Sequence, residues 1–219
     1  MQILLCAATP FEIQPTLDIV QSTGRNSQIN VCITGVGLLT ATYAISKAIY
    51  LEKPNLIIQA GIGGSFDESL ALAQTVVVER EALGDSGVLE KSGFKSLFDL
   101  GLLSANQYPW QERWLVNPNT ILLNNTRLPQ VRGISVNEVT TASDRIAYLK
   151  NDLGAIVESM EGAALHYIAL QEGIPFLQLR SISNYVGERD KTKWKLAEAI
   201  ESLNTNLQRI LLKFAEQWN

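Results

Sequence analysis

The sequence predicts one α/β domain over residues 1–219, a three-layer αβα sandwich with a central mixed, largely parallel sheet. Short apolar segments alternate with longer segments of helical pattern along the chain, which favours strands joined by helices. Several apolar segments are hydrophobic at nearly every position, as is typical of strands covered on both faces. The 219 residues, 46% of them hydrophobic, are enough for one sizeable core.

The expected elements follow each other in a regular order. Strands are predicted at 2–8 (QILLCAA), 30–37 (NVCITGVG), 55–64 (NLIIQAGIGG), 75–80 (TVVVER), 131–139 (VRGISVNEV), 155–160 (AIVESM) and 175–183 (PFLQLRSIS). Helices are predicted at 10–23, 38–52, 143–151 and 162–172, and a last helix carries one apolar stripe formed by Leu196, Ala199, Ile200, Leu203, Leu207, Ile210, Leu211 and Phe214. Residues 81–128 break this order with Gly, Asn and Pro, so a loop-rich excursion is expected there.

The composition excludes several classes of protein. A net charge of −4 without a Lys/Arg block argues against nucleic acid as a partner. No apolar run approaches the ~20 residues of a membrane span, and the N-terminus lacks the basic flank and cleavage site of a signal peptide. Cys6 and Cys32 lie in apolar segments, so we expect buried free thiols and a cytoplasmic protein. With one histidine, His166, and two separated cysteines, neither a metal site nor another cofactor is expected.

Ligands of parallel sheets bind beyond the carboxyl ends of the strands, so residues at those ends are candidates for a site. Glu12, in "TPFE" after the first strand, is either the partner of Thr9 in a capping box or a carboxylate available as a base. "TGVG" lacks the third glycine of a dinucleotide fingerprint. "AGIGG" allows a ligand to approach the backbone around Ile62 and Gly63.

The segment "VESMEGAALHY" places two acids, Glu158 and Glu161, around a strand-to-helix junction. The helix dipole alone favours an acid there. Met160 beside them is either core filler or a ligand contact. His166 is predicted to be a packed or partly exposed histidine without a chemical role, although histidine is often catalytic.

The order of these motifs is distinctive. A carboxylate follows the first strand, a "GIGG" turn lies mid-chain, and "SMEGAA" precedes "RSISN" by about twenty residues. The chain thereby resembles the nucleoside phosphorylase and nucleosidase superfamily over essentially its whole length, because the late signature of that superfamily runs as an E-M-E-A-like junction and an R-A-I-S-D-like strand end. Within it, "ESMEGAA" with "RSISNYVGERDKTKW" looks most like the futalosine hydrolase family, which acts in an alternative menaquinone pathway.

The resemblance implies a purine nucleoside phosphorylase-like fold and hydrolysis of an N-glycosidic bond. Glu12 would orient or deprotonate the attacking water, Glu161 would bind the ribose hydroxyls, and Met160 would pack on the sugar. The reaction develops positive charge on the ribose and negative charge on the base, so a carboxylate against the sugar and a hydrogen-bonding group at N7 both help. A carboxylate is also a suitable base for the water, as in glycoside hydrolysis.

The residue that matches Asn184 is usually an aspartate, which protonates or hydrogen-bonds N7 of a leaving adenine. An asparagine can donate its amide hydrogen to O6 and place its carbonyl oxygen against a protonated N7. A site whose buried polar groups match one base discriminates, since the wrong base leaves them unpaired. Asn184 therefore favours a 6-oxopurine such as hypoxanthine, with the N7 proton delivered through water; the alternative is a plain turn residue.

Water is favoured over phosphate as the attacking group. The related phosphorylases hold phosphate with an arginine after the first strand and an arginine–serine pair around the central glycine turn. The corresponding places here carry Glu12, Gln59 and Ile62. A carboxylate at the phosphate position would repel the anion.

The resemblance also suggests how the 5′ end of the nucleoside is held. Futalosine carries a carboxyphenyl ketone chain there. Trp194 matches an aromatic residue over the 5′ group, and Arg189, Lys191 or Lys193 are the candidates to pair with the carboxylate.

Two further contacts are implied. The backbone around Thr141 and Ala142 would contact the base. Related dimers close the 5′ pocket with a loop from the partner subunit, for which residues 98–114 are the candidate, so a homodimer or higher homo-oligomer is expected.

Three other functions stay open on the sequence. They are a 5′-methylthioadenosine or S-adenosylhomocysteine nucleosidase, a 6-oxopurine nucleoside phosphorylase, and a nucleoside-binding module that kept the fold without the chemistry. The presence of both Glu12 and Glu161 disfavours the last.

Overall fold

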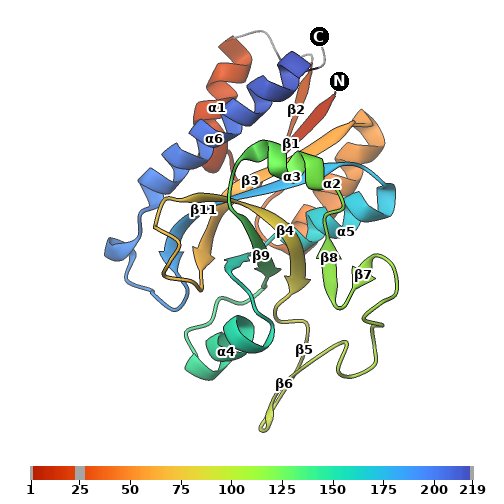
Figure 1. Cartoon of the computed structure of the whole chain (residues 1–219), viewed down its shortest axis with the longest axis vertical. Coiled ribbons are helices and arrows are strands. Elements are labelled where there is room, and N and C mark those ends of the chain that lie inside the picture. The colour runs from red at the N-terminus through yellow and green to blue at the C-terminus, as the bar shows by residue number, and fades with distance from the viewer. Residues whose placement is uncertain (1, 23–27, 218–219) are drawn as a thin grey trace.

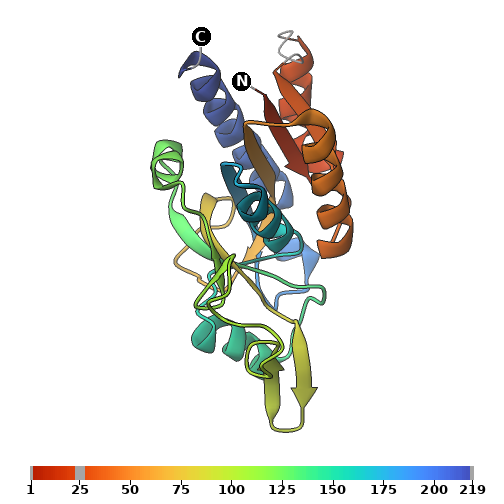
Figure 2. The ribbon, with the colours of Figure 1, turned by 90° about the vertical axis from the view of Figure 1, so that its right-hand side faces the viewer.

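The computed structural model describes residues 2–22 and 28–217, and within them a nine-stranded mixed sheet runs through the molecule with helices on both faces (Figures 1 and 2). Its strands are β1 (Ile3–Ala7), β2 (Ile29–Ile33), β3 (Leu56–Ser65), β4 (Thr75–Leu83), β7 (Trp110–Gln111), β8 (Trp114–Val116), β9 (Gln130–Ser135), β10 (Val157–Ser159) and β11 (Phe176–Tyr185). The predicted α/β sandwich and each predicted strand are confirmed.

The sheet curls instead of staying flat. The strand β3 pairs in parallel with β1 and β11, and its last residues pair antiparallel with β10. The pairings then continue from β10 to β9, from β9 to β4 and from β4 back to β11, so five strands close on themselves. Glycines at Gly61, Gly63 and Gly64 supply the close backbone approach that such a bend requires.

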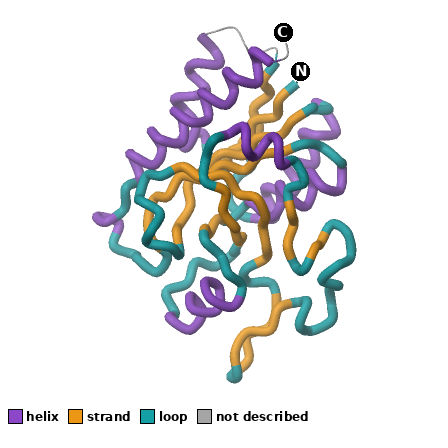
Figure 3. The backbone as a smooth tube through the Cα atoms, in the orientation of Figure 1, coloured by secondary structure: helices purple, strands orange, loops and turns teal. Residues whose placement is uncertain are grey.

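The helices form two layers that enclose the two halves of the core (Figures 1 and 3). On one face, α1 (Pro10–Ser22) packs on α6 (Leu196–Gln217), whose Leu203, Leu207 and Ile210 are buried against β1, β3 and β11. On the other face, α2 (Leu38–Glu52) packs on α5 (Gly162–Glu172). The smaller helices are α3 (Thr120–Thr126) and α4 (Ser143–Ala147), the latter continued by a π-helical turn (Tyr148–Asp152), and a 3₁₀ turn (Lys191–Lys193) precedes α6.

Residues 81–128 are more ordered than the predicted loop-rich excursion. The strand β4 runs on to Leu83, a hairpin of β5 (Gly87–Glu90) and β6 (Gly93–Ser96) projects from the body, β7 and β8 extend the sheet, and α3 follows. These added strands have two to four residues each. Such short strands are below the length at which alternation is visible in a sequence, so they were not predicted, whereas the segments between them are loops and turns, as expected.

The two cysteines are free thiols, as predicted. They face each other in register on the neighbouring parallel strands β1 and β2. Cys6 is buried, whereas Cys32 is only partly buried because β2 is an edge strand. Across residues 2–22 and 28–217, no helix is both long and apolar enough to cross a membrane.

Candidate active site

The carboxyl ends of β1, β3 and β11 meet at one edge of the sheet, because the three strands are parallel neighbours. Glu12 stands there, in the first turn of α1. Its Oε2 accepts hydrogen bonds from the backbone N–H of Thr9 at 3.0 Å and the Thr9 hydroxyl at 3.1 Å, while its Oε1 accepts from the N–H of Ile62 at 3.1 Å. One oxygen therefore takes part in the predicted cap and the other faces the glycine turn, whereas the role of Glu12 as a base stays a prediction.

Glu161 lies at the opposite side of this edge, as the residue that precedes α5. Its Oε1 accepts a hydrogen bond from the N–H of Gly37 at 3.1 Å, and its Oε2 lies 3.4 Å from Nη2 of Arg180. Gly37 has φ +94°, a left-handed conformation that suits glycine, and α2 begins directly after it. Three segments distant in sequence thus fix one carboxylate.

Arg180 is the functional residue that the sequence interpretation missed. Its side chain is 1% exposed, and its guanidinium also donates to the backbone O of Ile62 at 3.3 Å and to Oε1 of Gln59 at 3.2 Å. A β-carbon on Gly61 would lie 2.5 Å from Nη1 of Arg180 and 3.0 Å from Oε1 of Glu12, so the guanidinium lies close to both acids of the site. An arginine inside an apolar strand was the available signal, since a buried cation needs a partner.

An irregularity in β11 sets the direction of the Asn184 side chain. Arg180 pairs with Gly61 and Ile182 with Gly63, but the register then shifts and Asn184 pairs with Gly64. Side chains alternate along a strand, so this bulge turns Asn184 to the face opposite to Arg180. There its Oδ1 accepts from the Ser183 hydroxyl at 2.8 Å and its Nδ2 donates to the backbone O of Tyr185 at 3.0 Å.

Trp194 is held beside Asn184 by the backbone. The N–H of the next residue, Lys195, donates to the O of Ser183 at 2.8 Å, and Nε1 of Trp194 donates to the O of Glu188 at 3.1 Å. The guanidinium of Arg189 lies over the Trp194 ring, 5.9 Å from its centre. Trp194 and Arg189 therefore lie together after the end of β11. Their contact with the 5′ group stays a prediction.

The other two cation candidates are less suited to that role. Lys193 is committed to a salt bridge of 2.7 Å with Glu188, and Lys191 is exposed in the same 3₁₀ turn.

The remaining predicted residues lie around these groups. Met160 is partly buried directly before Glu161. Ile62 and Gly63 belong to the end of β3, as expected, and Ile62 contributes both its N–H and its O to the site. Thr141 and Ala142 are exposed in the segment that leads into α4. Their contact with a base stays a prediction.

The segment 98–114 packs first on its own chain. The Tyr108 hydroxyl donates to the O of Leu170 in α5, and the ring of Trp110 lies 6.2 Å from that of Tyr167 and 5.1 Å from that of Phe98. Its role at a partner's site is therefore a question of assembly, and it stays a prediction.

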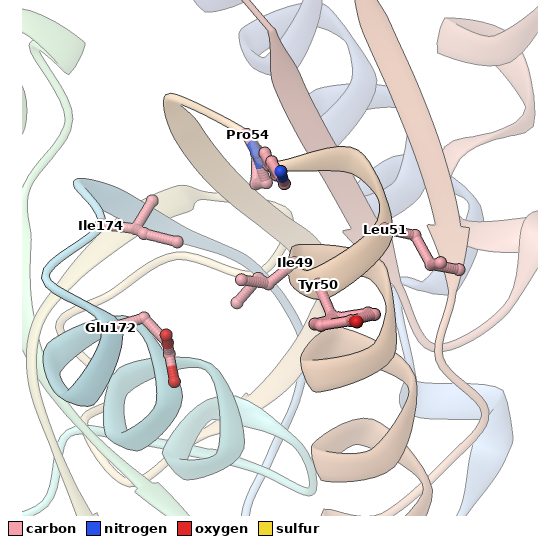
Figure 4. A pocket seen from close by; sticks show the side chains of 7 residues that line it. Ile49, Tyr50, Leu51, Pro54, Glu172 and Ile174 are labelled. Carbon is pink, nitrogen blue, oxygen red and sulfur yellow. The ribbon is translucent and has the colours of Figure 1, made fainter.

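A separate cavity of about 530 Å³ lies at the other end of the sheet, between the end of α2 and the end of α5 (Figure 4). It is lined by Ile49, Tyr50, Leu51, Lys53, Pro54, Glu172 and Ile174. Pro54 and Ile174 precede β3 and β11, so this cavity lies at the amino ends of the strands. It holds none of the predicted residues. Over the described ranges, no group of three or more His, Cys, Asp or Glu could hold a metal ion.

A curled α/β sheet with two carboxylates, an arginine and an amide at one edge is the arrangement of an enzyme of the nucleoside phosphorylase type. The sequence model of the Phosphorylase superfamily matches residues 5–216, and the chain belongs to that superfamily.

Individual proteins are also similar to the chain. The chain is 30% identical to the futalosine hydrolase of Streptomyces coelicolor over 75% of its own length and 68% of the relative's. It is 28% identical to the futalosine hydrolase of Thermus thermophilus over 81% and 79%, respectively. Among solved structures, the futalosine hydrolase of Helicobacter pylori superimposes with a TM-score of 0.79 at 17% identity, covering 97% of this chain and 98% of the other.

Proposed function

We propose that this chain hydrolyses the N-glycosidic bond of futalosine and releases hypoxanthine and dehypoxanthine futalosine. The observation that carries the proposal is Asn184, an amide at the end of β11, in a chain whose Glu12 and Glu161 lie at the same edge of the sheet. An amide can serve O6 and N7 of a 6-oxopurine. The two relatives at about 30% identity, both futalosine hydrolases, support the same substrate.

The chemistry follows from the positions of the two acids. Glu161, fixed by Arg180 and by the N–H of Gly37, would accept hydrogen bonds from the ribose hydroxyls and favour positive charge on the sugar. Glu12 would take a proton from water as the water oxygen bonds to C1′. The electron pair of the broken C1′–N9 bond goes to the purine, and a proton delivered through water neutralises it at N7. Asn184 stabilises the departing base by hydrogen bonding without supplying that proton.

Hydrolysis is proposed in preference to phosphorolysis. Oε1 of Glu12 is directed at the backbone of Ile62, where an attacking group would have to stand. A second negative charge beside this carboxylate is unfavourable, whereas a neutral water is not.

At the 5′ end, Trp194 would form an aromatic wall against the carboxyphenyl group and Arg189 would pair with its carboxylate. Arg189 is exposed and its guanidinium is free of a salt bridge among the described residues. The substitution Arg189→Glu tests this: KM for futalosine should rise about tenfold, while KM for inosine, which has no carboxylate, should stay constant. An unchanged KM for futalosine would remove Arg189 from the proposal.

We further propose a cytoplasmic homodimer or higher homo-oligomer. Leu39, Tyr43 and Tyr50 share one stripe of α2 and are 85%, 68% and 80% exposed, which is unusual for large apolar side chains on one face. Sedimentation of the protein should give a multiple of 24.1 kDa, and Tyr43→Glu should shift it toward the monomer. A monomeric wild type would contradict this. The free thiols at Cys6 and Cys32 fit a reducing compartment.

The decisive experiment offers futalosine, inosine and 5′-methylthioadenosine to the pure protein, each with and without phosphate, and measures the released base. Hypoxanthine from futalosine at a rate independent of phosphate is the expected result. Phosphate dependence would favour the phosphorylase, and adenine from methylthioadenosine would favour the nucleosidase for adenine nucleosides. The variant Asn184→Asp should lose about 10²-fold in preference for the 6-oxopurine, since an aspartate matches the adenine edge.

A further inference from the structure

A third acid near the site, Glu158, has a carboxyl oxygen without a hydrogen-bond partner among the described residues. Glu158, in β10, is 7% exposed, and within the described parts of the chain its buried Oε2 has no hydrogen-bond partner. Buried carboxyl oxygens are almost always hydrogen-bonded, because leaving one unpaired is costly. An orphaned oxygen at the edge of a binding site is therefore a candidate for contact with a ligand.

The sheet register places Glu158 opposite Asn184. Glu158 pairs with Gly64 of β3 from one side, and Asn184 pairs with the same Gly64 from the other. Paired residues of neighbouring strands point to the same face of the sheet. The side chains of Glu158 and Asn184 therefore project from one face, with Gly64 between them. Nδ2 of Asn184 lies 3.4 Å from where a β-carbon of Gly64 would be, which confirms that face for the amide. The two backbones are two strand spacings apart, about 10 Å.

Gly64 between them carries no side chain, and its neighbours leave no room for one. A β-carbon there would lie 3.1 Å from Cγ2 of Val186 and 3.4 Å from Nδ2 of Asn184. Asn184 and Glu158 thus lie on either side of an apolar side chain, Val186, and polar groups beside an apolar surface suit the edge and the face of a purine.

The pKa of Glu158 lies near neutral pH. Burial and, to a smaller extent, the negative charge of Asp85 raise it and the guanidinium of Arg189 lowers it, with a net pKa of about 7. A hydrogen bond donated by a ligand would favour the ionised form.

A 6-oxopurine presents two neighbouring groups, the acceptor O6 and the donor N1–H, whereas adenine presents a donor at C6 and an acceptor at N1. Asn184 can serve the first group by donating its amide hydrogen. The second group needs an acceptor with no hydrogen of its own. We infer that Glu158 is a second specificity-determining residue, whose carboxylate accepts the N1–H of the 6-oxopurine while Asn184 serves O6. The inference rests on the proposed function for the identity of the base.

The same contact would reject adenine. Its N1 lone pair would face the ionised carboxylate, so neither group could donate, and adenine could be held only by the protonated form of Glu158. Base selection would then depend on two residues on either side of Gly64, and changing Asn184 alone would not convert the enzyme fully to adenine nucleosides.

The test measures binding of free bases by calorimetry, so that it does not depend on turnover. The wild type should bind hypoxanthine about 10²-fold more tightly than adenine. In Glu158→Gln, whose amide can donate to N1, that ratio should fall at least tenfold. Glu138→Gln, an exposed acid in the segment before α4, is the matched control and should keep the wild-type ratio.

A second pair of measurements guards against a folding defect. Glu158→Ala should bind 1-methylhypoxanthine, which lacks N1–H, as tightly as hypoxanthine, whereas the wild type should prefer hypoxanthine. Hypoxanthine binding by the wild type should also weaken below pH 7 as Glu158 becomes protonated, and the alanine variant should lack that change.

The outcomes separate the two proposals. Hydrolysis of futalosine together with an unchanged hypoxanthine-to-adenine ratio in Glu158→Gln would overturn the role of Glu158 and leave the function standing. A ratio that falls as expected, in a protein that does not hydrolyse futalosine, would support Glu158 and contradict the substrate. A wild type that binds adenine more tightly would overturn both.

Discussion

Two groups of buried polar residues lie near the amino end of α5, and they accommodate burial in opposite ways. At the ligand edge, Arg180 stands against Glu161 in a salt bridge and lies near Glu12. Deeper in the core, Glu81 is completely buried and forms no salt bridge: its Oε1 accepts from the Ser135 hydroxyl at 3.0 Å, and Arg180 acts on it only through its charge. The outer group contains a cation and the inner one does not.

The pKa values of the inner group reflect this burial without a salt bridge. Burial raises the pKa of Glu81 to about 7 and lowers the pKa of His166 to about 4. Nδ1 of His166 lies 2.9 Å from the O of Leu115, so this histidine is a packed core residue, as the sequence predicted. Burial alone pushes both groups toward neutrality. The difference between the regions is one of pairing: the carboxyl at the ligand edge has a cation as its salt-bridge partner, whereas the carboxyl in the core is hydrogen-bonded to a hydroxyl.

The largest loss of activity is expected from a substitution in the outer group. Glu12→Gln keeps the shape and the acceptor oxygen but cannot take a proton, so kcat for nucleoside hydrolysis should fall about 10³-fold with little change in KM. Thr9→Val removes only the hydroxyl that contacts the other oxygen and should cost less than about tenfold. Steady-state kinetics decides, and a Gln variant within tenfold of the wild type would show that Glu12 only caps the helix.

The second-largest loss of activity is expected from adding a single methyl group beside the outer group. In Gly61→Ala the new carbon would stand 2.5 Å from Nη1 of Arg180, so the guanidinium must move and its 3.4 Å contact with Glu161 must loosen. We expect kcat/KM to fall about 10²-fold, which corresponds to ~2.7 kcal/mol of transition-state stabilisation. Retained activity would mean that the position of Arg180 is not critical.

The matching change in the inner group should affect stability instead of activity. A β-carbon on Gly162 would lie 2.3 Å from Nε2 of Gln178 and 2.6 Å from Oε2 of Glu81. Overpacking of this kind costs about 1–3 kcal/mol, so urea denaturation of Gly162→Ala should show that loss in the free energy of unfolding. The kcat of the folded fraction should stay within about threefold of the wild type; a larger loss at unchanged stability would contradict the separation of the two groups.

The smallest effect concerns the charge of Glu81. Below its ordinary pKa of 4.5 this acid is protonated in both the folded and the unfolded chain, and between 4.5 and about 7 it ionises only in the unfolded chain. The wild type therefore loses stability as pH rises through that window. Glu81→Gln lacks this loss, so its free energy of unfolding should gain about 1–2 kcal/mol on the wild type between pH 5 and pH 8.

The exposed Glu138→Gln serves as the control for that comparison and should show no such gain. A constant difference between Glu81→Gln and the wild type across the pH range would mean that Glu81 is ionised in the folded protein.

The sequence determined the strands, the helices of the two layers, and the acids Glu12 and Glu161, because continuous apolar runs, helical spacing and residues at strand ends are local features. It also identified Asn184 as the unusual residue. It did not reveal the strands β5 to β8, which are too short to show a period.

Only the tertiary structure decided how these residues meet. Arg180 becomes a site residue because its long side chain spans from β11 to the junction before α5, and no spacing in the sequence encodes that reach. The bulge in β11 turns Asn184 to the face that Glu158 shares, an inversion produced by one shifted register step. A pattern along the chain fixes which residues lie at strand ends, but the pairing of strands fixes which of them face each other, and pairing depends on contacts between segments far apart in sequence.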